Sequence, residues 1–159
     1  MRIATSDGTA VTLQPRGWAP PTTGEADDEL VISGHVTIGD RDWSFTRPCL
    51  QIGEAYNLAR WLRAAADGSL QPAPAPESPA DDWPQLDFLD LSLAFSLAAR
   101  DQGQVVVRAY FTQDAAPPWL DEPASHTGQQ VVELRVRPDD LTAAAAEWTK
   151  ELDALVALR

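Results

Sequence analysis

Apolar and polar side chains alternate over residues 88–112, and this alternation limits the fold more than any other feature. Apolar residues occupy every second position from Leu89 to Leu97 and again from Val105 to Phe111. A repeat of two residues is typical of β-strands that turn one face toward a hydrophobic core. Residues 100–103, Arg-Asp-Gln-Gly, lie between the two runs and supply turn chemistry. The pattern predicts an antiparallel β-hairpin over residues 88–112.

Shorter runs with the same repeat predict further strands. Leu30 to Ile38 alternates, and the alternation resumes from Trp43 to Thr46 after Gly-Asp-Arg-Asp, so residues 30–46 predict another hairpin. Ala10 to Leu13 and Val132 to Val136 each predict one more strand.

Two segments have the spacing of amphipathic helices. Over residues 53–67 apolar side chains recur at intervals of three and four, and Gly68 suits the left-handed position that ends many helices. A second stripe runs from Leu141 to Leu155, and Asp139 or Asp140 can cap that helix and favour the positive end of its dipole.

These elements predict an α+β fold, with an antiparallel sheet of about five or six strands and two helices packed on it. A chain of 159 residues is an ordinary length for one domain, so we expect residues 1–159 to form a single domain. Residues 69–84 contain five prolines, which exclude a continuous helix or strand. We interpret this Pro/Ala-rich stretch as a long loop within that domain.

The charge balance restricts the partners. The chain has 24 acidic and 12 basic side chains, a formal net charge of −12. A negative field repels phosphate backbones and attracts basic proteins, so we expect a basic protein partner and no nucleic acid. No signal-peptide pattern opens the chain and no run approaches the length of a membrane span, so we expect no membrane contact and a cytoplasmic location. Cys49 is the only cysteine, which agrees with a reducing compartment.

No catalytic pattern is recognisable. His35 and His126 are the only histidines and lack metal-ligand spacing, and Asp40 and Asp42 are not followed by the further oxygen ligands that a hard cation needs. Nucleophile elbows, glycine-rich phosphate loops and Cys-x-x-Cys pairs are absent from the sequence. Two carboxylate pairs are open to acid–base chemistry in principle but are weak signals in so acidic a chain: Asp87 with Asp90, and Asp139 with Asp140. We therefore expect no enzyme, no metal site and no cofactor.

Four segments together resemble the WapI family of bacterial immunity proteins. They are Trp-Ser-Phe-Thr-Arg-Pro-Cys-Leu at residues 43–50, Glu-Ala-Tyr-Asn-Leu-Ala-Arg-Trp-Leu-Arg at 54–63, Pro-Pro-Trp at 117–119, and the leucine-rich closing helix. The likeness extends from about residue 30 to the end. It implies a protein that binds and silences the toxic C-terminal domain of a secreted polymorphic toxin, often a nuclease, inside the producing cell. It assigns no toxin-contacting residues.

Two predicted loops combine tryptophan with acidic residues. Such a combination favours protein binding, because acidic side chains steer a basic partner and aromatic side chains often dominate interface energy. The expected partner-binding residues are Asp81, Asp82, Trp83, Trp119, Asp121 and Glu122. Our hypothesis is that an acidic surface covers the active face of the toxin. The alternatives are a non-catalytic regulatory or scaffold module with another partner and, less favoured, a small hydrolase.

Overall fold

The computed structural model describes residues 1–20, 28–73, 84–120 and 129–159. Its strands form two four-stranded antiparallel sheets in which neighbours in sequence are neighbours in space. The first sheet contains β1 (Arg2–Ala4), β2 (Ala10–Trp18), β3 (Glu29–Ile38) and β4 (Arg41–Gln51). The second contains β5 (Leu86–Asp87), β6 (Leu93–Asp101), β7 (Gln104–Phe111) and β8 (Gln130–Val136).

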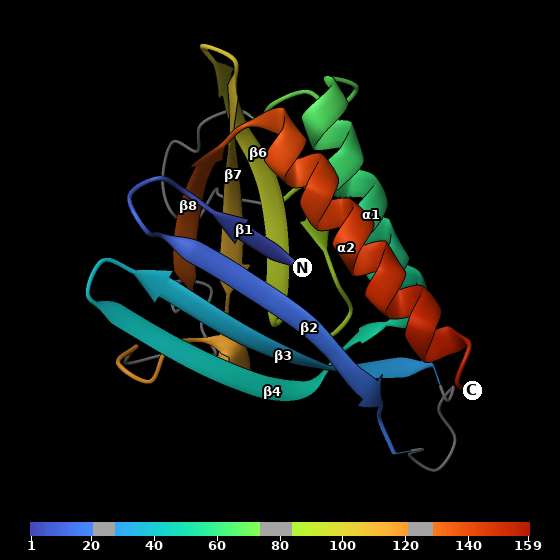
Figure 1. The fold of residues 1–159 in the computed structure, drawn as a ribbon. Coiled ribbons are helices and arrows are strands. Elements are labelled where there is room, and N and C mark those ends of the chain that lie inside the picture. The colour runs from blue at the N-terminus through green and yellow to red at the C-terminus, as the bar shows by residue number, and fades with distance from the viewer. Residues whose placement is uncertain (21–27, 74–83, 121–128) are drawn as a thin grey trace.

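Two helices and a short 3-10 turn complete the described elements. Helix α1 (Ile52–Asp67) directly follows β4, and helix α2 (Pro138–Val156) follows β8. The 3-10 turn η2 (Gln113–Ala115) follows β7 and packs against β4. Figure 1 shows α1 and α2 side by side, next to the two sheets.

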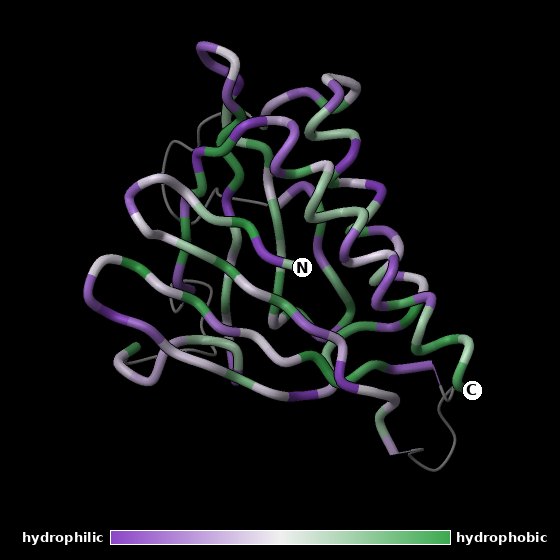
Figure 2. The backbone as a smooth tube through the Cα atoms, in the orientation of Figure 1, coloured by the Kyte–Doolittle hydropathy of each residue, from purple (hydrophilic) through white to green (hydrophobic). Residues whose placement is uncertain are grey.

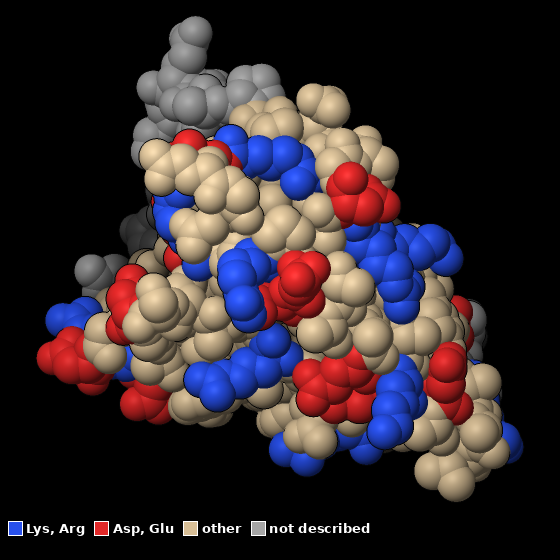
Figure 3. Space-filling view, turned by 45° about the horizontal axis from the view of Figure 1, so that its top comes forward, with Lys and Arg blue, Asp and Glu red and all other residues tan. Residues whose placement is uncertain are grey.

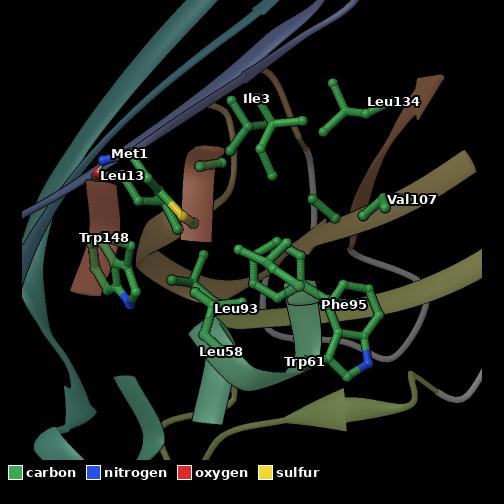
Figure 4. Close-up of a cluster of buried hydrophobic side chains, with 14 of the residues drawn as sticks. Met1, Ile3, Leu13, Leu58, Trp61, Leu93, Phe95, Val107, Leu134 and Trp148 are labelled. Carbon is green, nitrogen blue, oxygen red and sulfur yellow. Dashed lines mark hydrogen bonds between the residues drawn. The ribbon is translucent and has the colours of Figure 1, made fainter. Parts of the chain in front are cut away.

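The hydrophobic core lies where the two sheets and the helices meet. Figure 4 shows Ile3 and Leu13 from the first sheet, Phe95 from the second, Leu58 from α1 and Trp148 from α2 directed into this region. All five side chains are almost completely buried. In Figure 2 the turns at the ends of the hairpins are largely hydrophilic, as expected for segments that face water. None of the described helices is long and apolar enough to cross a membrane.

The α+β class predicted from the sequence is confirmed, and so are both helices and both hairpins. The strand number differs, because eight strands in two sheets replace one sheet of five or six. The additional strands β1 and β5 have three and two residues. Segments this short contain too few positions to show a repeat of two.

The hairpin predicted over residues 88–112 is confirmed in its central part but begins later than expected. Strand β6 starts at Leu93, and Leu89 and Leu91, which were assigned to the apolar face of a strand, are exposed. The backbone N–H of Leu91 donates to the carbonyl of Phe88 at 2.9 Å, which closes a turn. This turn interrupts the extended backbone that strand pairing requires.

Both helices begin with a carboxylate that bonds back to the residue before the helix. Glu54 accepts a hydrogen bond from the backbone N–H of Gln51 at 2.9 Å, and Asp140 accepts one from Arg137 at 3.2 Å. Such carboxylates satisfy donors that have no partner within the helix. Helix α2 begins at Pro138, so the capping position is Arg137 and not Asp139 or Asp140 as expected. Asp140 lies in the first turn of the helix.

Cys49 gives a first testable prediction. Its thiol is 1% exposed, and burial, with a contribution from the charge of Asp90, raises its pKa to about 12. At pH 8 the folded protein should therefore hold almost no thiolate, whereas an unfolded cysteine ionises near pH 8.5. We expect iodoacetamide to label native Cys49 at least about a hundredfold more slowly than the same protein in denaturant. Mass spectrometry measures the labelling rate in each state. Equal rates in the native and the denatured protein would contradict the burial of Cys49.

Candidate functional site

Three aromatic rings meet where η2 packs on β4. The indole Nε1 of Trp43 donates to the carbonyl of Ala115 at 2.9 Å. The Trp43 ring makes edge contacts with Phe111 and with Trp119, each at a centroid distance of 5.5 Å. The guanidinium carbon of Arg41 lies 5.5 Å from the centre of the Trp119 ring. Trp43 is buried, and Trp119 is 39% exposed and presents a supported aromatic surface to solvent.

Arg47 of β4 joins two segments that are distant in sequence. One terminal nitrogen lies 3.0 Å from a carboxylate oxygen of Asp90, and the other lies 2.8 Å from a carboxylate oxygen of Asp114 in η2. The Arg47 side chain is 18% exposed, whereas that of Asp114 is 85% exposed. Because Arg47 and Asp90 are both largely shielded from water, their ion pair should be stronger than a pair between fully exposed side chains, whereas the pair with Asp114 is open to water at its acidic end. They tie the turn before β6 to the turn after β7.

Residues 88–91 form a turn, called the 88–91 turn below, that exposes two leucines to solvent. Leu89 is 74% exposed and Leu91 is 59% exposed, whereas Phe88 between β5 and these leucines is 3% exposed. The backbone N–H of Leu89 donates to Glu54 of α1 at 2.9 Å. The hydroxyl of Thr112 donates to the carbonyl of Leu91. The turn is thus attached to α1 and to the end of β7 as well as to Arg47.

The backbone is strained at two positions in this region. Leu91 has a φ of 60° and Gln113 a φ of 51°, so both residues adopt the left-handed conformation. This conformation costs a non-glycine residue about 1–2 kcal/mol. The third described non-glycine residue with positive φ is Gln102, which lies in the two-residue β6–β7 turn, where such a conformation is normal. Strained residues tend to cluster at functional positions.

Of the six residues predicted to contact a partner, Trp119 is the one that the structure describes. It is 39% exposed at the edge of the aromatic cluster, and its role as a contact stays a prediction. The remaining five lie outside the described residues: Asp81, Asp82, Trp83, Asp121 and Glu122. The sequence analysis did not single out Leu89, Leu91 and Asp114, which the structure leaves exposed in this region. The Asp-Phe-Leu-Asp-Leu run at residues 87–91 was available as a signal, but its alternation resembled that of a strand.

The described residues do not gather into a recognisable catalytic centre. Among them there is no group of three metal-binding side chains. Hydrogen bonds hold the pKa values of three described carboxyls below the ordinary value, at Asp7, Asp67 and Asp140. A general acid near neutral pH needs the opposite shift. One member of each carboxylate pair considered above forms an ion pair: Asp90 with Arg47, and Asp140 with Arg137.

The negative charge is unevenly distributed along the chain. Segments 21–27, 74–83 and 121–128 contain seven of the 24 acidic residues and none of the 12 basic ones. In the view of Figure 3, basic and acidic side chains are interspersed over the described surface. That face does not present a field of a single sign.

Comparison with known proteins assigns this chain to a family. The model of the WapI-like immunity protein family matches residues 2–155. The chain belongs to this family. Searches of curated proteins and of solved structures gave no significant match. Membership implies an immunity role against a toxin, as the resemblance of residues 43–50 and 54–63 suggested. For a WapI-like protein, the exposed side chains that lack a role in the fold become candidates for toxin contact.

Proposed function

We propose that this WapI-like protein binds the toxic C-terminal domain of a cognate secreted toxin and covers the active face of that domain. The target is a basic nuclease domain, and binding takes place in the cytoplasm of the producing cell without any catalysis by the immunity protein. The family match over residues 2–155 carries the proposal. Because nuclease active faces bind phosphate backbones through lysine and arginine, an acidic protein is a complementary partner for them.

The net negative charge of the chain supports binding to a basic toxin domain. A net charge of −12 can raise the association rate with a basic partner about 10- to 1,000-fold at low salt. Charges at the rim of an interface mainly set the rate and the selectivity, so affinity also needs buried anchors, for which tryptophan is well suited. We therefore keep Asp81, Asp82, Trp83, Trp119, Asp121 and Glu122 as proposed contacts with the toxin.

Co-expression tests this function. The C-terminal domain of a large toxin gene beside this one should arrest growth when it is expressed alone, and the immunity protein should restore growth. Reversing Asp81 and Asp82 to lysine, or Asp121 and Glu122 to lysine, should weaken rescue, because each pair removes attraction and adds repulsion.

A matched control separates local charge from total charge. Asp101→Lys with Asp139→Lys changes the net charge equally, at the tip of the β6–β7 hairpin and the start of α2. In Figure 1 the β6–β7 turn and the start of α2 lie at the top, away from β4, against which η2 packs. The control should preserve rescue. Absence of rescue by the unaltered protein would contradict the immunity function, whereas rescue by every reversal variant would contradict only the acidic mechanism.

A further inference from the structure

The geometry points to the 88–91 turn as a preformed apolar anchor that inserts Leu89 and Leu91 into a pocket on the toxin, with basic side chains around that pocket. This inference rests on the proposed function, since it assigns part of the toxin-binding surface. It is independent of the five predicted contacts that lie outside the described residues.

The first argument is the cost of placing these leucines where they are. Leu91 is 59% exposed, so it gains little from burial, and its φ of 60° adds a backbone cost. Asparagine or glycine would adopt the same conformation more easily. Leu89, at 74% exposure, contributes equally little to the core. An apolar pair with so small a benefit to folding is explained by a benefit in binding.

The second argument is rigidity. Three separate parts of the chain hold the turn. Glu54 of α1 accepts from the N–H of Leu89 at 2.9 Å, and Arg47 of β4 pairs with Asp90 at 3.0 Å. Thr112, which directly follows β7, donates to the carbonyl of Leu91. The buried Phe88 ring packs 6.4 Å from that of Phe95 and fixes the base of the turn. A turn already held in one conformation loses little entropy on binding, which favours affinity.

The third argument identifies the partner. Four carboxylates lie in or beside the turn and its contacts: Asp87, Asp90, Asp114 and Glu54. The cation contacting them is Arg47, which is shared between Asp90 and Asp114. Asp87 is exposed and the Asp114 side chain is 85% exposed, so the rim is negative. A partner with an apolar pocket bordered by lysine or arginine is complementary to this surface.

The binding test uses the purified full chain and the isolated C-terminal domain of the adjacent toxin, with affinity measured by calorimetry. Leu89→Ser and Leu91→Asn should each weaken binding about tenfold or more, as expected for anchors at an interface centre. Leu91→Asn should fold with an unchanged or higher melting temperature, because asparagine tolerates the left-handed conformation. Loss of affinity together with retained stability separates a binding role from a structural one.

The matched control is Leu158→Ser, which removes a leucine that is 86% exposed near the end of the chain. It should bind like the unaltered protein. Binding of both turn variants within about twofold of the unaltered protein would overturn this inference while the immunity function stands. An unaltered protein that does not bind the domain would overturn both. Sedimentation that shows a dimer dissociated by the leucine substitutions would also overturn it, because the turn would then join two copies of this chain.

Association kinetics test the basic character of the pocket. Asp87→Lys should slow association several-fold at low salt, and the difference should fade as salt rises. Asp101→Lys makes the same charge change at the other end of β6, about 25 Å from the turn, and should have a much smaller effect. Equal effects of the two variants would overturn the assignment of a basic rim.

Discussion

Replacing Trp148 with alanine is expected to lower the free energy of unfolding by about 3–5 kcal/mol, the range seen when a large aromatic side chain is removed from a core. Trp148 is 0% exposed and lies among side chains from the first sheet and α1 (Figure 4). Its indole Nε1 also donates to the carbonyl of Ala55 at 2.8 Å, which links α2 to α1. The substitution would therefore leave a cavity where the helices meet the core.

Urea denaturation followed by circular dichroism measures this effect. Trp148→Phe should cost less than the alanine variant, because it keeps most of the apolar volume and loses the hydrogen bond. Trp119→Ala is the control for loss of a tryptophan, since that side chain is 39% exposed and lies at the edge of its aromatic cluster, and it should cost clearly less than Trp148→Ala. If Trp148→Ala were as stable as Trp119→Ala, Trp148 would not support the core.

Replacing Gly34 with alanine is expected to destabilise the protein by about 1–3 kcal/mol, although the change adds a single methyl group. A Cβ at position 34 would lie 2.1 Å from two ring carbons of Phe45, its partner across the β3–β4 pair. The Phe45 ring is 7% exposed and lies 6.1 Å from that of Phe111, so it must leave a packed position to make room. An aromatic ring covering a glycine on the next strand is a known way of pinning strand register.

A double-mutant cycle tests this cause directly. Phe45→Leu alone should cost stability, but adding Gly34→Ala to it should cost less than in the unaltered background, because the shorter side chain avoids the new methyl group. Additive effects of the two substitutions would show that the Phe45 ring is not what makes alanine unfavourable at position 34. Urea titrations of the single and double variants give the free energies of unfolding that the cycle needs.

The two kinds of prediction concern different parts of the molecule. Trp148 and Gly34 support the core and the first sheet, whereas Leu89 and Leu91 are proposed to contact the toxin. A destabilised core should reduce rescue by lowering the amount of folded protein, with the affinity of the remaining folded molecules unchanged. Measuring stability and affinity for every variant therefore distinguishes the two causes of a lost phenotype.

Local pattern predicted most of the secondary structure. Helix α1 and strands β3, β6 and β7 follow from the spacing of apolar residues, because the repeat of a helix or strand is a property of neighbouring positions. Gly68, expected to end the first helix, has a φ of 91° and occupies that position. The family resemblance was also visible in the sequence, and the match over residues 2–155 confirmed it.

The candidate site was predicted only in part. Trp119 was proposed as a contact because of its type and its loop position, and the structure shows it exposed beside Trp43. Leu89 and Leu91 were assigned to a strand because their spacing continued that of Leu93 and the residues after it. The alternation was real, but it did not reveal that the backbone turns before Leu93.

By itself, the sequence determined which segments are helices and strands, the α+β class, the excess of negative charge and the family. The tertiary structure decided that the strands divide into two sheets and that residues 88–91 form an exposed turn. That turn depends on Thr112, Glu54 and Arg47, which are 21, 35 and 43 positions away in the chain from the turn residues they contact. Periodicity reports the preferences of adjacent residues, whereas these contacts exist only once distant elements have packed together.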